Sequence, residues 1–377
     1  MSGRRTLLVT NDFPPRPGGI QRFVHDLAVR QPSDSVVVYA STWKRAAEFD
    51  ARQPFEVIRE DTTVLLPTRS VARRAAEIAR ANGCDTVWFG AAAPLGLLAS
   101  GLRRRAGIER AVAQTHGHEV GWAALPGARG LLRRIGRGCD VVTYLTEYQR
   151  VRLGRVLDAL TSLERLAPGV DVDLYSPKVD GTPIRERHNL VDRPVVVCVS
   201  RLVPRKGQDN LVRAFPAIRR RVPDAALLLV GGGPNRSTVE RLAREAGVER
   251  HVVLTGSVPW EELPMHYAAG DVYAMPCRTR GRGLDVEGLG IVYLEASATG
   301  LPVVAGDSGG APDAVRDGET GFVVGGRDVA VIADRVARLL EDSSLASRMG
   351  AAGRAWVDAE WRWDLQAERM RTLLEGR

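Results

Sequence analysis

The stretch VYAMPCRTRGRGLDVEGLGIVYLEASATGLPVVA, residues 272–305, contains a strand, a loop, a helix and a second strand in that order. Its outer segments, Val272–Pro276 and Pro302–Ala305, are short and apolar, as strands buried on both faces are. Between them, Gly290–Thr299 has the composition of a helix, and the glycine and proline after it mark its end. A strand, a helix and another strand in succession predict two parallel strands of one sheet.

The same alternation runs along the whole chain and pauses once, at Pro168–Arg193, a stretch rich in Asp, Pro and Gly. A length of 377 residues suits about two domains. We therefore predict an α/β protein with two Rossmann-like parallel-sheet domains facing a central cleft, joined by this linker. Ligands bind outside the carboxyl ends of the strands in such sheets, so the sequence predicts the functional site in the cleft.

The net charge of +8 is unevenly distributed. Residues 1–168 carry 25 Lys and Arg against 16 Asp and Glu, a balance of +9, and the remainder carries 28 against 29, a balance of −1. The basic clusters at 73–74, 103–105 and 133–137 contain no aromatic residue, which disfavours nucleic-acid binding. They are either solvated helix faces or a surface attracted to an anionic membrane leaflet.

The four cysteines are far apart and show no CxxC spacing. We interpret them as reduced thiols of a cytosolic protein. The apolar run near the N-terminus is too short for a signal peptide, and no run is long enough to span a membrane.

Two glycines, Gly18 and Gly19, end the loop that follows the first predicted strand, Thr6–Thr10. A helix begins near Gln21, so the loop can bring backbone N–H groups and the helix dipole to an anion. The pattern is not GxGxxG, which disfavours a nicotinamide-binding domain. The alternative interpretation is a plain tight turn.

In the second half, the strand Val195–Ser200 delivers Arg201 and Lys206 to the carboxyl edge of the predicted sheet. An arginine fork and a lysine point charge at such an edge suit a pyrophosphate, although surface charges are the alternative. Gly231-Gly232-Gly233 ends another strand and forms either a close-approach loop or a flexible turn.

Two glutamates, Glu287 and Glu295, flank the start of the helix predicted over Gly290–Thr299. The first N–H groups of this helix have no intrahelical partner and can receive a phosphate. Glu295 lies one turn further in, where it suits ribose hydroxyls. Glu287 lies on the loop before the helix and faces whatever is attached to the phosphate. The two therefore do not form an acid/base pair.

Two sequence patterns could hold a metal ion, but their surroundings disfavour it. His116, His118 and Glu119 follow an apolar strand, but the sequence places no further ligand near them. Asp171 and Asp173 form a DxD, but they lie in the predicted linker, where turn-forming aspartates are common. We expect no metal and no other cofactor.

Taken together, these motifs resemble the retaining glycosyltransferases of family four, which have the two-domain GT-B fold. The resemblance spans nearly the whole chain in the right order. It rests on the Gly18-Gly19 loop, Gly169-Val170-Asp171, Arg201 with Lys206-Gly207, Gly231–Pro234, and Glu287 and Glu295 with seven residues between them. It implies an acceptor domain at 1–168, a nucleotide-sugar donor domain at 169–359, and a C-terminal helix, 360–377, that packs back on the first domain.

The resemblance also implies the role of each site residue. Arg201 and Lys206 resemble the clamp that stabilises the leaving diphosphate, with Gly18 and Gly19 contacting it from the first domain. Glu287 resembles the residue that binds the donor sugar, and Glu295 the one that binds ribose. A histidine beside the transferred sugar corresponds to His116, with His118 as the register alternative. The backbone contacts to the donor come from Gly288, Leu289, Gly290, Ile291 and Val292. In the family picture the acceptor attacks on the face that the diphosphate leaves, and the diphosphate takes the proton.

Within the family, THGHEVGW at 115–122 and the long loop before Glu287 are similar to the actinobacterial branch that mannosylates phosphatidylinositol monomannoside. This implies GDP-mannose as donor, an anionic glycolipid acceptor, α-1,6 addition of a second mannose, and an enzyme peripheral to the inner face of the cell membrane. Leu125–Gly138 is either a membrane-surface helix or an ordinary amphipathic helix. Another donor or a soluble acceptor is the main alternative; a sugar-nucleotide binder or an epimerase is a further one. The oligomeric state is open.

Overall fold

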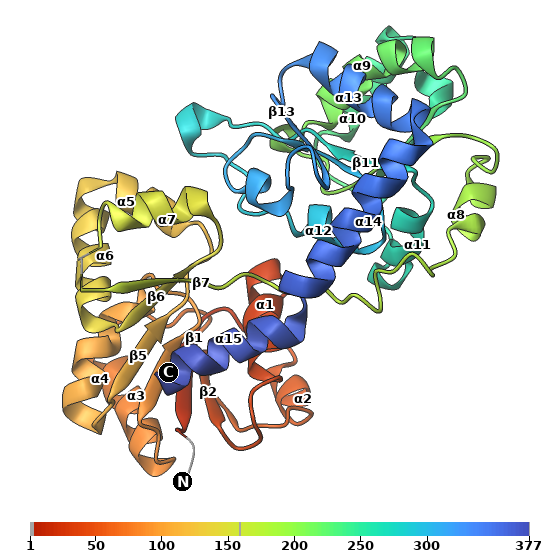
Figure 1. The fold of residues 1–377 in the computed structure, drawn as a ribbon. Coiled ribbons are helices and arrows are strands. Elements are labelled where there is room, and N and C mark those ends of the chain that lie inside the picture. The colour runs from red at the N-terminus through yellow and green to blue at the C-terminus, as the bar shows by residue number, and fades with distance from the viewer. Residues whose placement is uncertain (1–3, 158–159, 377) are drawn as a thin grey trace. The chain divides into compact units, whose positions relative to one another are not determined.

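A computed structural model describes residues 4–157 and 160–376, and the chain in it divides into two units (Figure 1). Unit 1 runs to Gly169 and resumes at Trp363, and unit 2 comprises Val170–Arg362. Each unit contains one parallel β-sheet surrounded by helices. The predicted class, two Rossmann-like parallel-sheet domains, is confirmed.

Unit 1 contains a seven-stranded sheet with the order β3-β2-β1-β4-β5-β6-β7. The strands are β1 (Thr6–Thr10), β2 (Val36–Ser41), β3 (Val57–Glu60), β4 (Thr86–Phe89), β5 (Arg110–Ala113), β6 (Val141–Tyr144) and β7 (Ser162–Arg165). The helices are α1 (Gly19–Ala28), α2 (Ala46–Asp50), α3 (Arg69–Ala81), η1 (Leu95–Leu98), α4 (Ala99–Ala106), α5 (Glu119–Ala124), α6 (Pro126–Gly138), α7 (Glu147–Gly154) and α15 (Trp363–Glu375).

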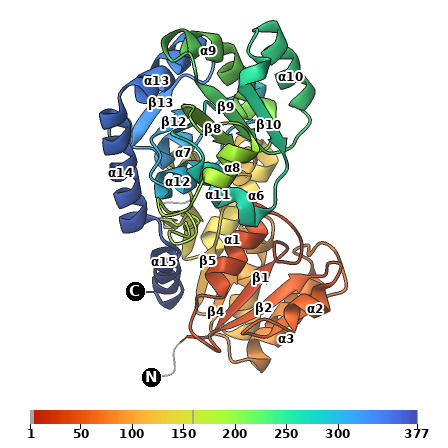
Figure 2. The same cartoon turned by 90° about the vertical axis from the view of Figure 1, so that its right-hand side faces the viewer.

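Unit 2 contains a six-stranded sheet with the order β10-β9-β8-β11-β12-β13. The strands are β8 (Val195–Val199), β9 (Ala226–Val230), β10 (Val252–Gly256), β11 (Val272–Met275), β12 (Val303–Gly306) and β13 (Gly321–Val324). The helices before β11 are α8 (Thr182–Arg187), η2 (Pro204–Lys206), α9 (Gln208–Arg221), α10 (Arg236–Glu245), η3 (Glu249–His251), η4 (Trp260–Glu262) and α11 (Leu263–Ala268). Those after it are η5 (Gly281–Gly283), α12 (Ile291–Ala298), η6 (Ala311–Ala314), α13 (Val329–Glu341) and α14 (Ser343–Glu360), and α13 packs against α9 (Figure 2).

The central strands of both sheets are apolar on both faces because helices cover them. The residues of β8 and β9, VVVCV and ALLLV, are all buried. In each sheet the strand order reverses once, between β1 and β4 in unit 1 and between β8 and β11 in unit 2. Such a reversal opens a crevice outside the carboxyl ends of the two strands, where ligands of open α/β sheets bind. The fold therefore marks one candidate position on each sheet.

The predicted linker is wrong in most of its length. Val170–Arg193 belongs to unit 2, and it contains α8, which contacts α11. The side chain of Arg354 holds the first part of this segment by donating to the carbonyls of Val172 and Tyr175, at 2.8 Å each. Composition indicated a linker because turn residues are frequent there, but buried contacts fix the segment.

The C-terminal tryptophans lie in different units. Trp361 is 1% exposed and packs edge-on against Trp356 in unit 2. Trp363 begins α15 in unit 1, where its ring lies 6.1 Å from that of Phe23. Accordingly α15 runs beside α1, although the two come from opposite ends of the chain (Figure 1). The final helix thus begins at residue 363 rather than at 360.

The described cysteines and helices bear on two sequence expectations. Cys84, Cys139, Cys198 and Cys277 are all buried and unpaired, as core thiols are. Burial raises the pKa of Cys277 to about 11, so this thiol is protonated near neutral pH. Within 4–157 and 160–376, no helix has the length and apolar character needed to cross a membrane.

Candidate functional site

The turn after β8 places two cations at the carboxyl edge of the unit 2 sheet. Arg201 lies two residues after the end of β8 and is exposed, whereas the Lys206 side chain, at the end of η2, is 12% exposed. Gly207 caps α9 with φ +80°, and a Cβ atom there would lie 1.9 Å from the Pro276 carbonyl oxygen. Only glycine fits this close approach, so the turn packs tightly on the end of β11.

Lys206 is paired with Glu287, whose side chain is 7% exposed. The Lys206 Nζ lies 2.7 Å from Glu287 Oε2, but the contact falls outside hydrogen-bond angles, so it is an ion pair. Arg205 Nε lies 3.7 Å from the same oxygen. Arg205 also lies 3.5 Å from Asp285, so these two cations face two carboxylates. The exposed Arg201 adds a third cation and leaves a positive balance at this edge, which favours an anionic ligand.

The loop that carries Glu287 is fixed on both sides. The backbone carbonyl of Glu287 accepts from the Gly310 N–H at 2.9 Å, and the Glu287 N–H donates to Ser308 Oγ at 3.3 Å. Earlier in the loop, Arg278 makes two bonds to Asp209 at 2.7 and 2.8 Å, and both side chains are nearly buried. Burial alone would raise the pKa of Asp209, but the bonds from Arg278 outweigh it and hold this pKa low. The backbone that carries the Glu287 side chain is thus held in position.

The helix after this loop is α12, which begins at Ile291 with Gly290 as its N-cap at φ +80°. The predicted start at Gly290 is therefore one residue early. Among the described residues, the N–H groups of Gly290, Ile291 and Val292 donate to no protein acceptor. Free N–H groups at a helix start bind anions well. Of the other predicted backbone contacts, Gly288 is partly exposed, and the Leu289 side chain is buried.

Glu295 lies one turn into α12 and accepts a 2.6 Å hydrogen bond from the Tyr267 hydroxyl. Tyr267 is fully buried, and burial, aided by the charge of Glu295, raises its pKa well above the ordinary value. The phenol is therefore a permanent donor to the carboxylate. Below it, Tyr267 stacks on Tyr273 with ring centroids 5.8 Å apart. This aromatic support fixes the carboxylate that is predicted to bind ribose.

We predict that Tyr267→Phe weakens GDP binding about 3- to 10-fold, because Glu295 loses a charge-assisted hydrogen bond worth roughly 1–3 kcal/mol. Isothermal titration calorimetry with GDP measures this affinity. Tyr39→Phe is the matched control, because Tyr39 in unit 1 donates an equal 2.6 Å bond to Glu60. Equal losses of affinity in both variants would show that the effect is not specific to Glu295.

The glycine loop after β9 has a packing role. Gly231 and Gly233 have φ angles of +132° and +157°, and a Cβ atom on either would lie 2.2–2.3 Å from the carbonyl oxygens of Ser200 and Leu202. In addition, the Leu202 N–H donates to the Gly232 carbonyl at 2.9 Å. These glycines let the loop pack directly on the turn that carries Arg201, so they position a predicted diphosphate contact.

In unit 1, the loop from β1 to α1 lies at the reversal of strand order. Gly18 and Gly19 are exposed at its end, and a Cβ on Gly19 would meet no atom within 4 Å. The loop is anchored by Asn11, which exchanges two hydrogen bonds with the Leu65 backbone, at 2.6 and 2.9 Å. Arg59 also donates to the Pro14 carbonyl at 2.6 Å. Gly19 thus has open space in front of it on a fixed loop, whereas a Cβ on Gly18 would lie 2.0 Å from the Gln21 side-chain oxygen.

The histidines of the turn after β5 have different surroundings. His116 Nε2 lies 2.6 Å from the Gly90 carbonyl at the end of β4, and burial lowers its pKa. His118 is exposed, and its Nε2 lies 3.2 Å from Glu119 Oε1. Glu119 is fully buried and also accepts from the backbone N–H groups of His116 and Gly117, at 3.0 and 3.1 Å. One buried carboxylate therefore organises the turn that carries both histidines.

The two metal patterns have other roles in the structure. Asp171 Oδ1 accepts from the N–H groups of Asp173 and Leu174, at 3.2 and 3.0 Å, which is the turn role expected there. Glu119 accepts from the backbone N–H groups of His116 and Gly117. Over the described ranges, no group of three or more His, Cys, Asp or Glu side chains is arranged to hold a metal ion.

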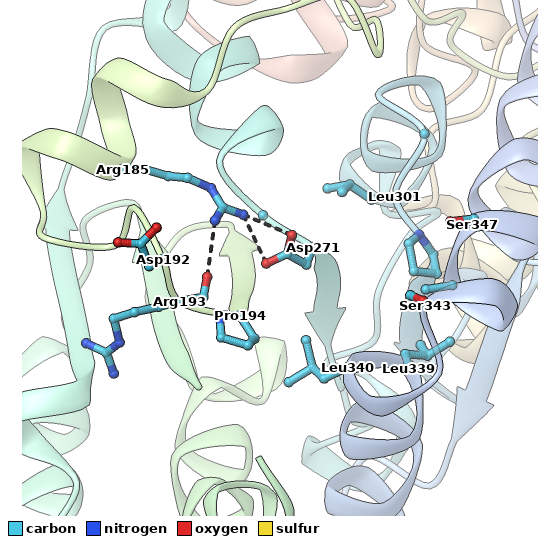
Figure 3. A pocket seen from close by; sticks show the side chains of 14 residues that line it. Arg185, Asp192, Arg193, Pro194, Asp271, Leu301, Leu339, Leu340, Ser343 and Ser347 are labelled. Atoms are coloured by element: carbon cyan, nitrogen blue, oxygen red, sulfur yellow. Dashed lines mark hydrogen bonds and ion pairs between the residues drawn. The ribbon is translucent and has the colours of Figure 1, made fainter. Parts of the chain in front are cut away.

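A pocket of about 520 Å³ lies elsewhere in unit 2, at the amino ends of β8, β11 and β12 (Figure 3). Its most prominent polar contact is that of Arg185, which makes two bonds to Asp271 at 2.9 and 3.0 Å and one to the Arg193 carbonyl at 3.1 Å. These groups satisfy one another. The chemistry is therefore assigned to the carboxyl edge and not to this pocket.

The structure thus groups the predicted residues on two sheet edges. In unit 2, Arg201, Lys206 and Glu287 follow β8 and β11 at the carboxyl edge, and Glu295 lies one turn into α12. In unit 1 the glycine pair and the histidines follow β1 and β5. Sequence reasoning missed Tyr267, which lies in an otherwise ordinary helix segment. It noticed Glu119 only as a possible metal ligand, although its place next to the histidines was a usable signal.

Sequence profiles of two glycosyltransferase families match the chain. The profile described as Glycosyl transferases group 1 matches residues 181–356, and that described as Glycosyltransferase Family 4 matches residues 17–174. Over 378 residues, the chain is 55% identical to the GDP-mannose-dependent alpha-(1-6)-phosphatidylinositol monomannoside mannosyltransferase of Mycolicibacterium smegmatis, covering 98% of each. It is 47% identical to a Corynebacterium glutamicum enzyme named for the monoacylated form of that acceptor, covering 100% of this chain and 99% of the relative.

Solved structures show the same fold at low identity. HepE from Anabaena, in complex with UDP, has a TM-score of 0.81 at 19% identity, covering 99% of this chain and 100% of that one. WaaG, a glycosyltransferase involved in lipopolysaccharide biosynthesis, has a TM-score of 0.66 at 20% identity with the same coverage. These similarities support the GT-B fold alone.

Proposed function

This chain belongs to the glycosyltransferases of family four, and from that membership we propose that it transfers mannose from GDP-mannose to a phosphatidylinositol monomannoside. The observation that carries the proposal is the 55% identity, along 98% of both chains, to a relative whose name states this reaction. The positive balance at the carboxyl edge of unit 2 is consistent with it, because the donor is a nucleoside diphosphate sugar.

In the proposed reaction, the diphosphate of the donor binds at the start of α12, where the N–H groups of Ile291 and Val292 donate to no acceptor in the described part of the chain. Arg201 and Lys206 stabilise the charge that develops on the leaving GDP. Glu295 accepts from the ribose hydroxyls, and Glu287 binds a hydroxyl of the mannose. Gly18 and Gly19 are proposed as further diphosphate contacts.

We propose a retaining reaction without a metal ion. The bond between the anomeric carbon and the phosphate oxygen breaks, and the acceptor oxygen bonds to that carbon on the same face. The acceptor proton passes to the leaving diphosphate. The cations of unit 2 supply the charge stabilisation that a bound metal provides in other transferases. His116 or His118 lies beside the sugar, and His118 has the more exposed ring.

The function is tested with purified protein and phosphatidylinositol monomannoside in detergent micelles. GDP-mannose should give a lipid product one hexose heavier, with an α-1,6 linkage by NMR, and added EDTA should not lower the rate. Product from a UDP-sugar but not from GDP-mannose would contradict this proposal and would indicate a family-four enzyme with another donor. Hydrolysis or epimerisation without a new lipid would exclude transfer to this acceptor.

We further propose that unit 1 contacts an anionic membrane surface through α6. Leu132 and Ile135 on this helix are buried, whereas Leu125 and Leu131 are 63% and 41% exposed beside exposed arginines. Exposed apolar side chains with flanking basic residues are typical of helices that lie at a membrane interface. The net charge of +9 over residues 1–168 adds attraction to anionic headgroups.

We predict that Leu131→Asp lowers binding to anionic phospholipid vesicles by about 5-fold or more, because an apolar contact is lost and a repelled charge is gained. Co-sedimentation with vesicles measures the bound fraction. Val331→Asp in unit 2 is the matched control, since Val331 is 37% exposed. Unchanged vesicle binding of Leu131→Asp would rule out this surface of α6.

A further inference from the structure

Unit 1 has a pocket of about 360 Å³ beside its β1–α1 loop. It is lined by segments that follow β1 and β2, so it lies at the carboxyl edge of the sheet, where ligands bind. The half-buried lining residues are Pro15, Trp43 and Phe49, and the exposed ones are Lys44, Arg45, Glu48 and Arg52. We call this the Trp43 pocket.

The charges at the Trp43 pocket favour an anion. Arg45 is neutralised by Glu48, to which it makes two bonds of 2.9 Å. Arg52 donates to the Glu48 carbonyl at 3.2 Å, and Lys44 has no ion-pair partner among the residues that the structure describes. Arg16 adds a further cation, because its guanidinium lies 5.2 Å from the centroid of the Trp43 ring. Four cations therefore face a single carboxylate.

The pocket is also built on a fixed backbone. Arg45 has φ +62°, in the left-handed region that a residue with a side chain adopts at a cost. Behind the pocket, the Phe49 ring lies edge-on against Phe13, with centroids 6.2 Å apart. Arg59 binds Asp50 in two bonds and also donates to the Pro14 carbonyl, so it ties α2 to the β1–α1 loop. The cations are thus held on a scaffold and not on a loose surface.

The Trp43 pocket lies beside the loop that carries the predicted diphosphate contacts of unit 1. Arg16 and Gly19 are three positions apart along the chain, so their Cα atoms are separated by at most about 10 Å. Gly18 and Gly19 are the proposed diphosphate contacts of unit 1, so on that proposal a group held at Arg16 would bind close to the donor. The proposed acceptor contains one phosphodiester, in the headgroup that receives the mannose.

We propose that the Trp43 pocket binds the phosphodiester of the acceptor headgroup, with Arg16, Lys44 and Arg52 as its charge partners. This inference rests on the proposed function and names the acceptor subsite of that reaction. Guanidinium and ammonium groups form charge-assisted hydrogen bonds with phosphate oxygens. The cation–π contact with Trp43 pre-orients Arg16 for this role.

The test uses the full chain saturated with GDP and the water-soluble, deacylated headgroup, glycerophosphoinositol monomannoside. We expect Lys44→Gln to weaken headgroup binding about 5-fold, and the Arg16→Gln, Lys44→Gln double variant by more than about 10-fold. The KM for the intact lipid should rise by similar factors, while GDP affinity stays within about 2-fold. Arg104→Gln is the matched control, because Arg104 is exposed on α4, near the amino end of β5, and carries the same charge.

The results of this test distinguish a headgroup subsite from a general effect of charge and from a contact with membrane lipids. An equal loss of headgroup binding in Arg104→Gln would overturn the proposal, because net charge alone would then explain binding. Unchanged headgroup binding with weaker vesicle binding would also overturn it, in favour of a membrane-lipid contact. If the wild-type enzyme mannosylates the lipid and the variants have the same KM for it, the phosphodiester subsite is rejected and the proposed function is retained. If the wild-type enzyme gives no product and binds no headgroup, both the subsite and the proposed function are rejected.

Discussion

Lys206→Ala is expected to lower kcat about 100-fold, with a smaller change in the KM for GDP-mannose. The ammonium stabilises charge that develops on the leaving diphosphate, and loss of one preorganised electrostatic partner costs about 2.7–4 kcal/mol in comparable sites. Lys206 is held 2.7 Å from Glu287 and is nearly buried, so no neighbouring water can replace it without cost. Steady-state rates at saturating acceptor measure the effect.

A loss of folding must be separated from this loss of rate. Removing Lys206 leaves the buried Glu287 carboxylate without its closest cation, so the midpoint of thermal unfolding is expected to fall. Lys206→Arg should recover part of the rate by restoring the charge. Lys178→Ala, at an exposed lysine of the same unit, is the control. A near-normal kcat for Lys206→Ala would contradict the diphosphate role.

Glu295→Ala is expected to weaken GDP binding about 10- to 100-fold, because two ribose hydroxyls lose their charged acceptor. Turnover at saturating donor should change less than affinity, since the ribose takes no part in bond breaking. Calorimetry with GDP measures the affinity. Glu245→Ala, at an exposed glutamate of α10, serves as the control.

The same change removes the partner of the buried Tyr267 hydroxyl, so some loss of stability is expected as well. The double variant Glu295→Ala, Tyr267→Phe removes both polar partners and should recover stability without recovering GDP affinity. Unchanged GDP affinity in Glu295→Ala would show that the ribose does not bind at this residue.

The sequence predicted the central parts of the fold because their pattern is strong. The strand β1 has the predicted bounds, and the apolar runs of β8 and β11 begin at Val195 and Val272, as the pattern predicted. These strands also predicted the positions of the site segments, because the residues that follow a buried parallel strand lie at the carboxyl edge of the sheet. Arg201 and the loop before Glu287 were therefore located without any contact information.

Edge strands and supporting contacts escaped this reasoning. The outermost strands β3 and β7, with the sequences VIRE and SLER, are partly exposed and carry too few apolar residues to show a pattern. The Tyr267 bond to Glu295 and the Arg278 bonds to Asp209 join residues 28 and 69 positions apart. Only the packed structure brings such pairs together, so periodicity and spacing contain no trace of them.

A crystal structure with bound GDP-mannose tests most directly whether this enzyme uses that donor at the carboxyl edge of unit 2. We predict the diphosphate at the N–H groups of Ile291 and Val292, within reach of Arg201 and Lys206. The ribose hydroxyls should lie on Glu295 and a mannose hydroxyl on Glu287. A donor bound at the amino ends of the strands, in the pocket of Figure 3, would contradict this account. So would a donor held at the carboxyl edge without contact to Lys206 or Glu295.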